Sequence, residues 1–357
     1  MTKERLYIRQ ADIEVSYHPL ICNDVTIQYF ENIELKLNSN WMKKPLVAIW
    51  TMTYNHCNYI KKCLDGIVQQ KTNFKFVALI HDDCSIDGTI EIIREYANKY
   101  PQIIKPIYEA ENQYKKHDGS LDIIKRNALV DIDAKYIAMC EGDDYWTDPY
   151  KLQKQVSFLE AHPDYAMCYT RVKQYKQCIS KYINDFGGPL ETFDDILQNN
   201  TIPTLSVLMR FDVYMSYLKE IKPECKGWSM GDYPVWLYFS AMSKIKFIPD
   251  TTGTYRILPN SLSHCEEKIK MINFGLCYRE IAHYFSLTYS NKQMQKITKN
   301  NLDWILFIKY CFINECDNAK KVARDALFSK QNSYLKNILF LIGIFSPTIV
   351  KRIYSWH

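Results

Sequence analysis

Short, continuous apolar runs that alternate with segments of helical spacing are the feature of this chain that most constrains its fold. Each run predicts a strand buried on both faces, because a half-buried strand would alternate apolar and polar residues. The runs cover residues 46–50, 74–80, 103–108 and 136–140. Between them, apolar residues recur every three or four positions, which predicts helices. Strand–helix alternation with doubly buried strands predicts an α/β fold, a mostly parallel sheet with helices on both faces.

The pattern is less regular after residue 160. The elements predicted there are strands at residues 165–172, 205–210, 246–248 and 253–257 and a helix at residues 230–242. From residue 266 to the end, the apolar spacing is helical. The predicted organisation is an N-terminal extension of uncertain structure (1–44), an α/β domain (45–265) and a helical C-terminal region (266–357).

Charge and cysteine content exclude several classes of protein. The net charge is +5, from 45 Lys and Arg against 40 Asp and Glu, and no long block of one sign suggests a nucleic-acid partner. The 12 cysteines form no CxxC pair, which argues against a zinc site and favours thiols in a reducing cytoplasm. No apolar segment has the length of a signal peptide core or a membrane span. These features predict a cytoplasmic protein.

The last segment of the chain allows two interpretations. It is apolar over residues 338–345, is interrupted by Pro347 and ends in a basic and aromatic stretch at residues 351–356. The first interpretation is a final helix docked on the body of the protein. The second is peripheral contact with the inner face of the membrane, because basic and aromatic residues suit a membrane interface.

Three polar clusters follow three of the predicted strands. Residues 53–55 (TYN) follow the first strand, residues 81–89 (HDDCSIDGT) the second, and residues 141–144 (EGDD) the strand that ends near residue 140. Ligands bind beyond the carboxyl ends of the strands in open parallel sheets, so we expect the clusters to form one site. Three carboxylates within four residues repel one another. They predict either a solvated turn or the oxygen ligands of a hard divalent cation.

These motifs, in this order, resemble those of the inverting family 2 glycosyltransferases. The shared pattern is an apolar strand ending in T-Y-N, then D-D-x-S-x-D-G-T, then R-N ahead of a strand that ends in an acidic cluster. The resemblance covers residues 45–265 and implies the GT-A fold, with residues 45–145 binding the nucleotide-sugar and residues 146–265 forming the acceptor side. It also implies a donor expected to be a UDP-sugar, a Mn²⁺ or Mg²⁺ cofactor, and a glycan or lipid-linked saccharide acceptor.

The resemblance assigns roles to the residues at matching positions. Asp143 is expected to touch the metal, with His264 as a further candidate ligand, and Glu141 stands where the family usually has Asp. Residues 85–89 are expected to build a turn and cap the following helix. The residues expected to bind the nucleotide-sugar are Thr53, Tyr54, Asn55, Asp82, Asp83, Arg126, Glu141, Gly142, Asp143 and Arg256.

The family also needs a general base that takes the proton of the acceptor hydroxyl. The matching stretch is SMGDYPVW, in which Asp232 is the candidate and Gly231 replaces the usual first acid. The structural alternative is that Asp232 only caps its helix. The candidates for the acceptor side are Asp144, Trp146, Trp228 and Tyr233. For the three aromatic residues, the alternative is packing in the core.

Transfer of a single sugar in the assembly of a bacterial surface polysaccharide or glycoconjugate is the predicted function, since no QxxRW signature of processive synthases occurs. A sugar-nucleotide nucleotidyltransferase would show a Gly-rich loop after the first strand, and TMTYNHCNYI is not one. A non-catalytic scaffold that binds a nucleotide-sugar or a glycan is the other alternative, because Glu141 and Gly231 replace usual acids.

Overall fold

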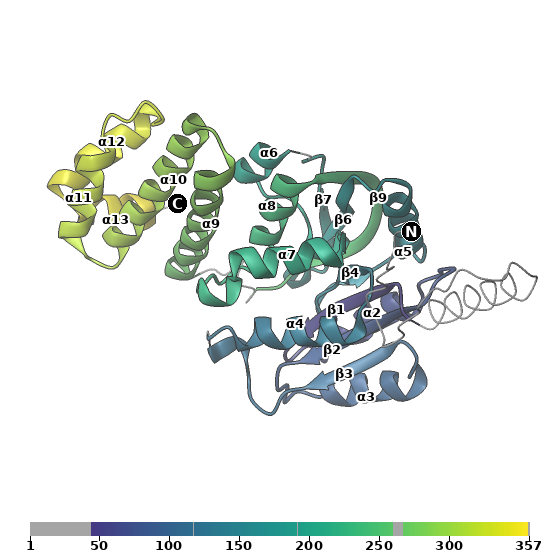
Figure 1. Cartoon of the computed structure of the whole chain (residues 1–357). Helices are drawn as coiled ribbons and strands as arrows, with labels where there is room; N and C mark the ends of the chain where they lie inside the picture. Colours follow the sequence, from purple (N-terminus) through teal and green to yellow (C-terminus); the bar gives the residue numbers. More distant parts are fainter. Residues whose placement is uncertain (1–43, 117, 191, 260–266, 356–357) are drawn as a thin grey trace, which may run out of the picture. The chain divides into compact units, whose positions relative to one another are not determined.

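A computed structural model describes residues 44–116, 118–190, 192–259 and 267–355 of the chain. The chain divides into two compact units, Met1–Lys44 and Pro45–His357, and nearly all of the described residues belong to the second unit (Figure 1). The predicted extension 1–44, except Lys44, and the predicted metal ligand His264 therefore lie outside the described residues.

The described part of the second unit is built around a nine-stranded sheet with the order β3-β2-β1-β4-β8-β6-β9-β5, and β7 pairs with β6. The neighbours β3, β2, β1 and β4 are all parallel. Beyond β4 the sheet is mixed: β8 is antiparallel to β4 and β6, whereas β6 and β9 are parallel. The strands are β1 (Val47–Thr53), β2 (Phe76–Asp82), β3 (Ile104–Tyr108), β4 (Tyr136–Met139), β5 (Tyr145–Trp146), β6 (Tyr165–Lys176), β7 (Lys181–Phe186), β8 (Leu208–Arg210) and β9 (Lys244–Ile257).

Helices cover both faces of this sheet, which confirms the predicted α/β fold (Figure 1). Strand β1 shows why residues 47–50, its first half, are all apolar. Val47 and Ile49 pack in the core with α2, α3 and α5, while Ala48 and Trp50 pack in the core on the opposite face with α4, α7 and α8. Alternate side chains of a strand point to opposite faces, so a strand covered on both sides needs apolar residues at every position.

The helices of the α/β part are α2 (Ile60–Val68), α3 (Thr89–Lys99), α4 (Ser120–Ile132), α5 (Lys151–Ala161), α6 (Phe193–Gln198), α7 (Phe211–Ile221) and α8 (Tyr233–Met242). The short segments predicted at residues 246–248 and 253–257 are one strand, β9, whose pairing with β6 contains register shifts. Helix α5 begins two residues after Pro149, because Asp148 accepts hydrogen bonds from the backbone N–H groups of Tyr150 and Lys151 and holds a turn there.

The C-terminal region is helical, as predicted. It consists of α9 (Lys268–Tyr289), α10 (Lys292–Phe312), α11 (Cys316–Ala326), α12 (Tyr334–Phe345) and α13 (Pro347–Ser355). A separate core that includes Phe307, Phe340 and Val350 holds these helices together. Among the residues described, no helix combines the length and the hydropathy that crossing a bilayer requires.

Candidate functional site

A cavity of about 670 Å³ lies beyond the carboxyl ends of β1 and β4. The charged residues that line it come from distant parts of the sequence and are Asp118, Asp122, Lys125, Glu141, Asp143, Glu224, Asp232 and Arg256. The loop after β4 supplies the two acidic residues Glu141 and Asp143, and the start of α8 supplies Asp232. Of the three polar clusters predicted to form one site, the EGDD cluster lines the cavity, whereas the described lining contains no residue of 53–55 or 81–89. The cavity lies at the edge of the sheet where ligands bind in such folds.

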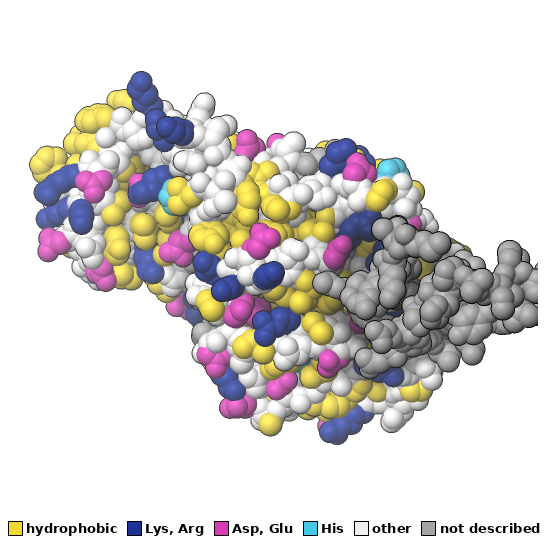
Figure 2. Space-filling view, in the orientation of Figure 1, with side chains coloured by type: hydrophobic (Ala, Val, Ile, Leu, Met, Phe, Trp, Pro, Cys, Tyr) yellow, Lys and Arg dark blue, Asp and Glu magenta, His cyan; other side chains and the backbone are white. Residues whose placement is uncertain are grey.

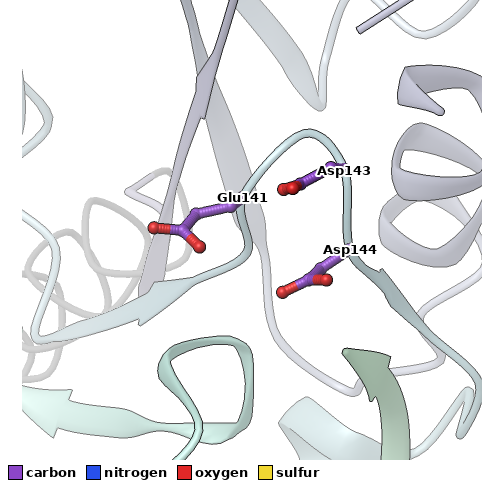
Figure 3. Close-up of side chains that lie close together, drawn as sticks. All are labelled: Glu141, Asp143 and Asp144. Atoms are coloured by element: carbon purple, nitrogen blue, oxygen red, sulfur yellow. The ribbon is translucent and has the colours of Figure 1, made fainter. Parts of the chain in front are cut away.

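The loop after β4 carries Glu141, Asp143 and Asp144, whose carboxylate oxygens lie within 4.8 Å of one another (Figure 3). Loss of hydration, followed by the negative charges of Asp143 and Asp232, raises the pKa of Glu141 to about 8. Burial, Asp143 and Glu141 likewise hold the pKa of Asp144 well above its usual range. The oxygen-only donor set fits Mg²⁺ or Mn²⁺, and a divalent cation would offset this mutual repulsion.

The three carboxylates are not equivalent as ligands. Asp144 is only 1% exposed, and its Oδ1 accepts a hydrogen bond of 2.7 Å from the backbone N–H of Arg256. Asp144 therefore ties the acidic loop to the end of β9, whereas its predicted place was on the acceptor side. Glu141 and Asp143 both line the cavity and are the residues that could hold a metal ion there.

Gly142 allows the acidic loop to lie directly against β1. Its backbone N–H donates to the carbonyl of Met52 at 2.9 Å. A Cβ atom at this position would lie 2.6 Å from Thr53 Oγ1 and 2.7 Å from Thr53 Cβ, closer than packed atoms come. Thr53 itself is only 1% exposed. Both residues were predicted to bind the nucleotide-sugar, and the structure shows them packed against each other.

We expect Gly142→Ala to destabilise the protein, because either the acidic loop or β1 must shift to admit the methyl group. Overpacking of this kind costs about 1–3 kcal/mol of unfolding free energy, which chemical denaturation will measure. Gly231→Ala is the matched control, since nothing lies within 4 Å of a Cβ at that position. Equal unfolding free energies of the two variants would show that the loop after β4 can shift to admit the methyl group at little cost in stability.

The second polar cluster contains two buried aspartates with different surroundings. Asp83 accepts hydrogen bonds on both oxygens, from the backbone N–H groups of Gln113 at 2.6 Å and Tyr114 at 3.1 Å. Asp82 Oδ2 accepts from the N–H of Ser85 at 2.9 Å. Its Oδ1 is buried and has no partner among the residues that the structure describes. Asp82 is 0% exposed and is not among the residues that line the cavity, while Asp83 holds the loop in place.

The TYN loop is clamped to the turn that follows β2. The N–H of Asn55 donates to Ser85 Oγ at 2.8 Å, and Asn55 Oδ1 accepts from the N–H of Ile86 at 2.9 Å. Burial opposes ionisation of Asp87, but hydrogen bonds from Thr89 and Cys57 lower the pKa of Asp87 to about 2. Asn55 was predicted to contact the nucleotide, and the structure shows that its side chain joins the two loops.

The predicted nucleotide contacts Tyr54 and Arg126 lie outside the cavity lining. Lys115 Nζ lies 5.5 Å from the centroid of the Tyr54 ring. Arg126 is 3.9 Å from Glu224 in an ion pair, and its side chain is 37% exposed. Its neighbour Lys125 lines the cavity and stabilises the charged form of Glu141. Sequence reasoning missed Lys125, although it directly precedes the R-N motif.

Arg256 lines the cavity from the end of β9, as predicted for a residue that binds the donor. Its guanidinium donates to the backbone carbonyl of Asp143. The guanidinium carbon lies 4.7 Å from the centroid of Tyr145 and 5.2 Å from that of Tyr59. These contacts fix the guanidinium of Arg256 beside the acidic loop. A phosphate group bound there could accept hydrogen bonds from this guanidinium.

Asp232 lies at the N-terminus of α8 and faces the same cavity as the acidic loop. Its Oδ1 accepts from the N–H of Tyr233 at 2.7 Å, and its Oδ2 accepts from Thr204 Oγ1 at 2.7 Å. The carboxylate is therefore a helix cap and a cavity group at the same time. Gly231 beside it is exposed and leaves open space.

The aromatic residues predicted for the acceptor side separate into two groups. Trp146 is 4% exposed and donates to the carbonyl of Leu205 at 2.7 Å, and Tyr233 is fully buried. Both pack in the core, so the structure corrects their predicted contact with a sugar. Trp228 lines the cavity, together with Phe274 and Tyr278 of α9. No sequence signal pointed to the last two residues, because they lie in the C-terminal helical region.

Comparison with known proteins gives similarities of sequence and of fold. Residues 49–216 match the family model described as glycosyl transferase family 2. An uncharacterized protein of Mycobacterium tuberculosis is 33% identical over 61% of this chain, and the chain spans about 60% of that relative's length. A putative teichuronic acid biosynthesis glycosyltransferase of Bacillus subtilis, TuaG, is 27% identical over 72% of this chain and 97% of its own.

Two solved structures are similar in fold, each at 15% sequence identity. Residues 1–349 of Staphylococcus aureus TarS in complex with UDP align with a TM-score of 0.51, over 87% of this chain and 91% of that one. A mannosyltransferase from Pyrobaculum calidifontis in complex with GDP-Man and Mn²⁺ aligns with a TM-score of 0.50, over 93% of this chain and 92% of that one.

Proposed function

Because this chain belongs to glycosyl transferase family 2 and has the GT-A fold, we propose that it moves one sugar from a nucleotide-sugar to a hydroxyl group of a glycan or a lipid-linked acceptor. One observation carries the proposal. The acidic pair Glu141 and Asp143 and the separate carboxylate Asp232 line the same cavity. Transfer between two substrates needs groups that hold a diphosphate and a base that accepts the proton of the acceptor. The acidic pair is suited to the first role and Asp232 to the second.

In the proposed reaction, the carboxylate of Asp232 takes the proton of the acceptor hydroxyl. The oxygen then attacks the anomeric carbon as the bond from that carbon to the diphosphate breaks, with inversion of configuration. Arg256 and Lys125 supply positive charge near the departing diphosphate. A Mn²⁺ or Mg²⁺ ion held by Asp143 and Glu141 would neutralise the remaining charge.

A UDP-sugar carrying a hexose or an N-acetylhexosamine is the proposed donor. Asp82 stands at the position that hydrogen-bonds the base in the family 2 glycosyltransferases, which supports a base with an N–H group. The TarS structure contains UDP, whereas the mannosyltransferase structure contains GDP-Man. We further propose a role in bacterial surface polysaccharide or glycoconjugate assembly on the cytoplasmic side of the membrane, which the similarity to TuaG, a putative teichuronic acid biosynthesis glycosyltransferase, supports.

A panel of nucleotide-sugars with Mn²⁺, scored for release of nucleotide, tests this function. We expect one UDP-sugar to be hydrolysed slowly without acceptor and the activity to disappear when the metal is removed. Binding of a nucleotide-sugar without turnover, in the presence of candidate acceptors as well, would instead support the non-catalytic scaffold.

The positions of Lys125 and Arg126 predict different effects of their removal. We expect Lys125→Ala to lower kcat/KM for the donor about tenfold or more, because a hydrogen bond to a charged group contributes roughly 1.5–3 kcal/mol. Arg126→Ala is the matched control and should stay close to the wild type, since its side chain lies outside the cavity. A larger fall in kcat/KM for Arg126→Ala than for Lys125→Ala would show that Arg126, and not Lys125, contacts the donor. Steady-state kinetics with the donor from the panel gives both values.

A further inference from the structure

The C-terminal helical region exposes large apolar side chains on one side of α12. Tyr334, Ile338, Leu341 and Phe345 recur every three or four residues, so they lie along one face of the helix. Tyr334 is 84% exposed and Phe345 is 79% exposed. The opposite face, with Phe340 fully buried, packs on the core of the region. Among the residues that the structure describes, no other element therefore covers this apolar stripe.

The loop that leads into α12 extends this stripe to a basic groove. Phe328, in the loop, is 75% exposed, and Leu335, in the first turn of α12, is 65% exposed. The same loop and α10 form a groove of about 590 Å³. The cations that line this groove are Lys292, Lys296, Lys299 and Lys330. Figure 2 shows hydrophobic side chains next to Lys and Arg over α11 and α12.

The groove is lined by four lysines and by two acidic residues, Asp303 and Asp325, so its charge is positive. Lys299 pairs with Asp303, but Lys292, Lys296 and Lys330 have no ion pair among the residues that the structure describes. Residues 267–355 as a whole contain fourteen Lys and Arg against six Asp and Glu. The chain as a whole has a net charge of +5, so its positive charge is concentrated in this region.

We propose that this face, consisting of Phe328, the exposed side of α12 and the lysine groove, binds the surface of an anionic lipid bilayer. The apolar side chains would enter the boundary between headgroups and acyl chains, while the lysines contact lipid phosphates. A second copy of the chain suits the face less well. An isologous dimer would bring the lysine-rich patches of both copies into one interface, where their like charges repel. The α12 stripe is about 18 Å long at 1.5 Å per residue, enough for an interfacial helix and too short for a span.

Co-sedimentation of the full chain with lipid vesicles tests the proposal. We expect binding to vesicles of phosphatidylcholine mixed with phosphatidylglycerol, weaker binding at high salt, and little binding to phosphatidylcholine alone. Two double variants should each weaken binding at least about tenfold: Phe328→Ser with Phe345→Ser, and Lys292→Glu with Lys296→Glu. For the lysine pair, the reason is that one surface cation contributes roughly 1 kcal/mol. All four side chains are exposed, so the variants should keep the fold, which thermal melting checks.

A matched control and a second measurement keep the outcome clear. Met242→Ser with Lys219→Glu removes an exposed apolar residue and an exposed lysine from α8 and α7 and should bind vesicles like the wild type. Equal binding to neutral and anionic vesicles would overturn the proposal. Sedimentation of a dimer that the Phe328→Ser and Phe345→Ser changes dissociate would overturn it in favour of a second copy. Vesicle binding needs no turnover, so the result does not depend on the proposed glycosyl transfer.

Discussion

Replacing Asp232 by Asn is expected to lower kcat for sugar transfer by about 10²–10⁴-fold, the range that a general base contributes, with donor affinity unchanged. The Asn side chain has the same shape and can still accept the hydrogen bond from the N–H of Tyr233. It cannot take a proton from the acceptor. The substitution therefore separates the two roles that the structure gives this residue, helix cap and cavity carboxylate.

Two measurements accompany this variant. Its free energy of unfolding should stay within about 0.5 kcal/mol of the wild type, because Asn and Asp are equivalent helix caps. Thr204→Val, which removes the hydroxyl that donates to Asp232 Oδ2, should reduce kcat less, because the base stays in place. Wild-type kcat in Asp232→Asn would leave Asp232 with a capping role alone, and the base would have to be sought elsewhere.

Removal of the Asp143 carboxylate is expected to abolish metal-dependent activity. We expect Asp143→Ala to lower transfer by about 10³-fold, because stabilisation of the leaving diphosphate by a metal contributes several kcal/mol. Addition of EDTA to the wild type should cause a loss of similar size. The variant should also lose the rise in melting temperature that Mn²⁺ and UDP give the wild type, since a ligand stabilises only a protein that binds it.

The control for this experiment is another carboxylate of the same cavity. Asp118→Ala removes a charge that lines the cavity but lies outside the acidic loop, so Mn²⁺ should still raise its melting temperature. Calorimetric titration with Mn²⁺ in the presence of UDP gives the affinities directly. If Asp143→Ala binds Mn²⁺ as tightly as the wild type does, Asp143 is not a metal ligand.

Much of the α/β part could be predicted from sequence, because its signals are local. The apolar runs that become β1 to β4 are strands whose own side chains face both cores, and this requirement is visible within each run. Strand β7 was missed because its side chains are largely exposed and carry no apolar pattern. The polar clusters after the strands were correctly expected near one edge of the sheet, because parallel strands end on the same side.

The sequence does not show which of two neighbouring residues lines the cavity. Lys125 and Arg126 stand side by side in α4, and one residue turns a helix by about 100°. Only the packing of α4 against the sheet decides that Lys125 lines the cavity and Arg126 meets Glu224. Trp146 and Tyr233 were misassigned for a similar reason. Their aromatic rings suit both a sugar and a core, and only the surrounding elements decide which one they meet.

The sequence by itself therefore determined the class of fold, the match of residues 49–216 to glycosyl transferase family 2 and the set of acidic and basic motifs. The tertiary structure alone decided which members of those motifs face the cavity, that α9 supplies Phe274 and Tyr278 to its wall, and that α12 keeps an exposed apolar face. The physical reason is the range of the interactions. Strand burial, helix period and turn chemistry are set within a few residues, whereas side-chain exposure depends on surfaces that come together from distant parts of the chain.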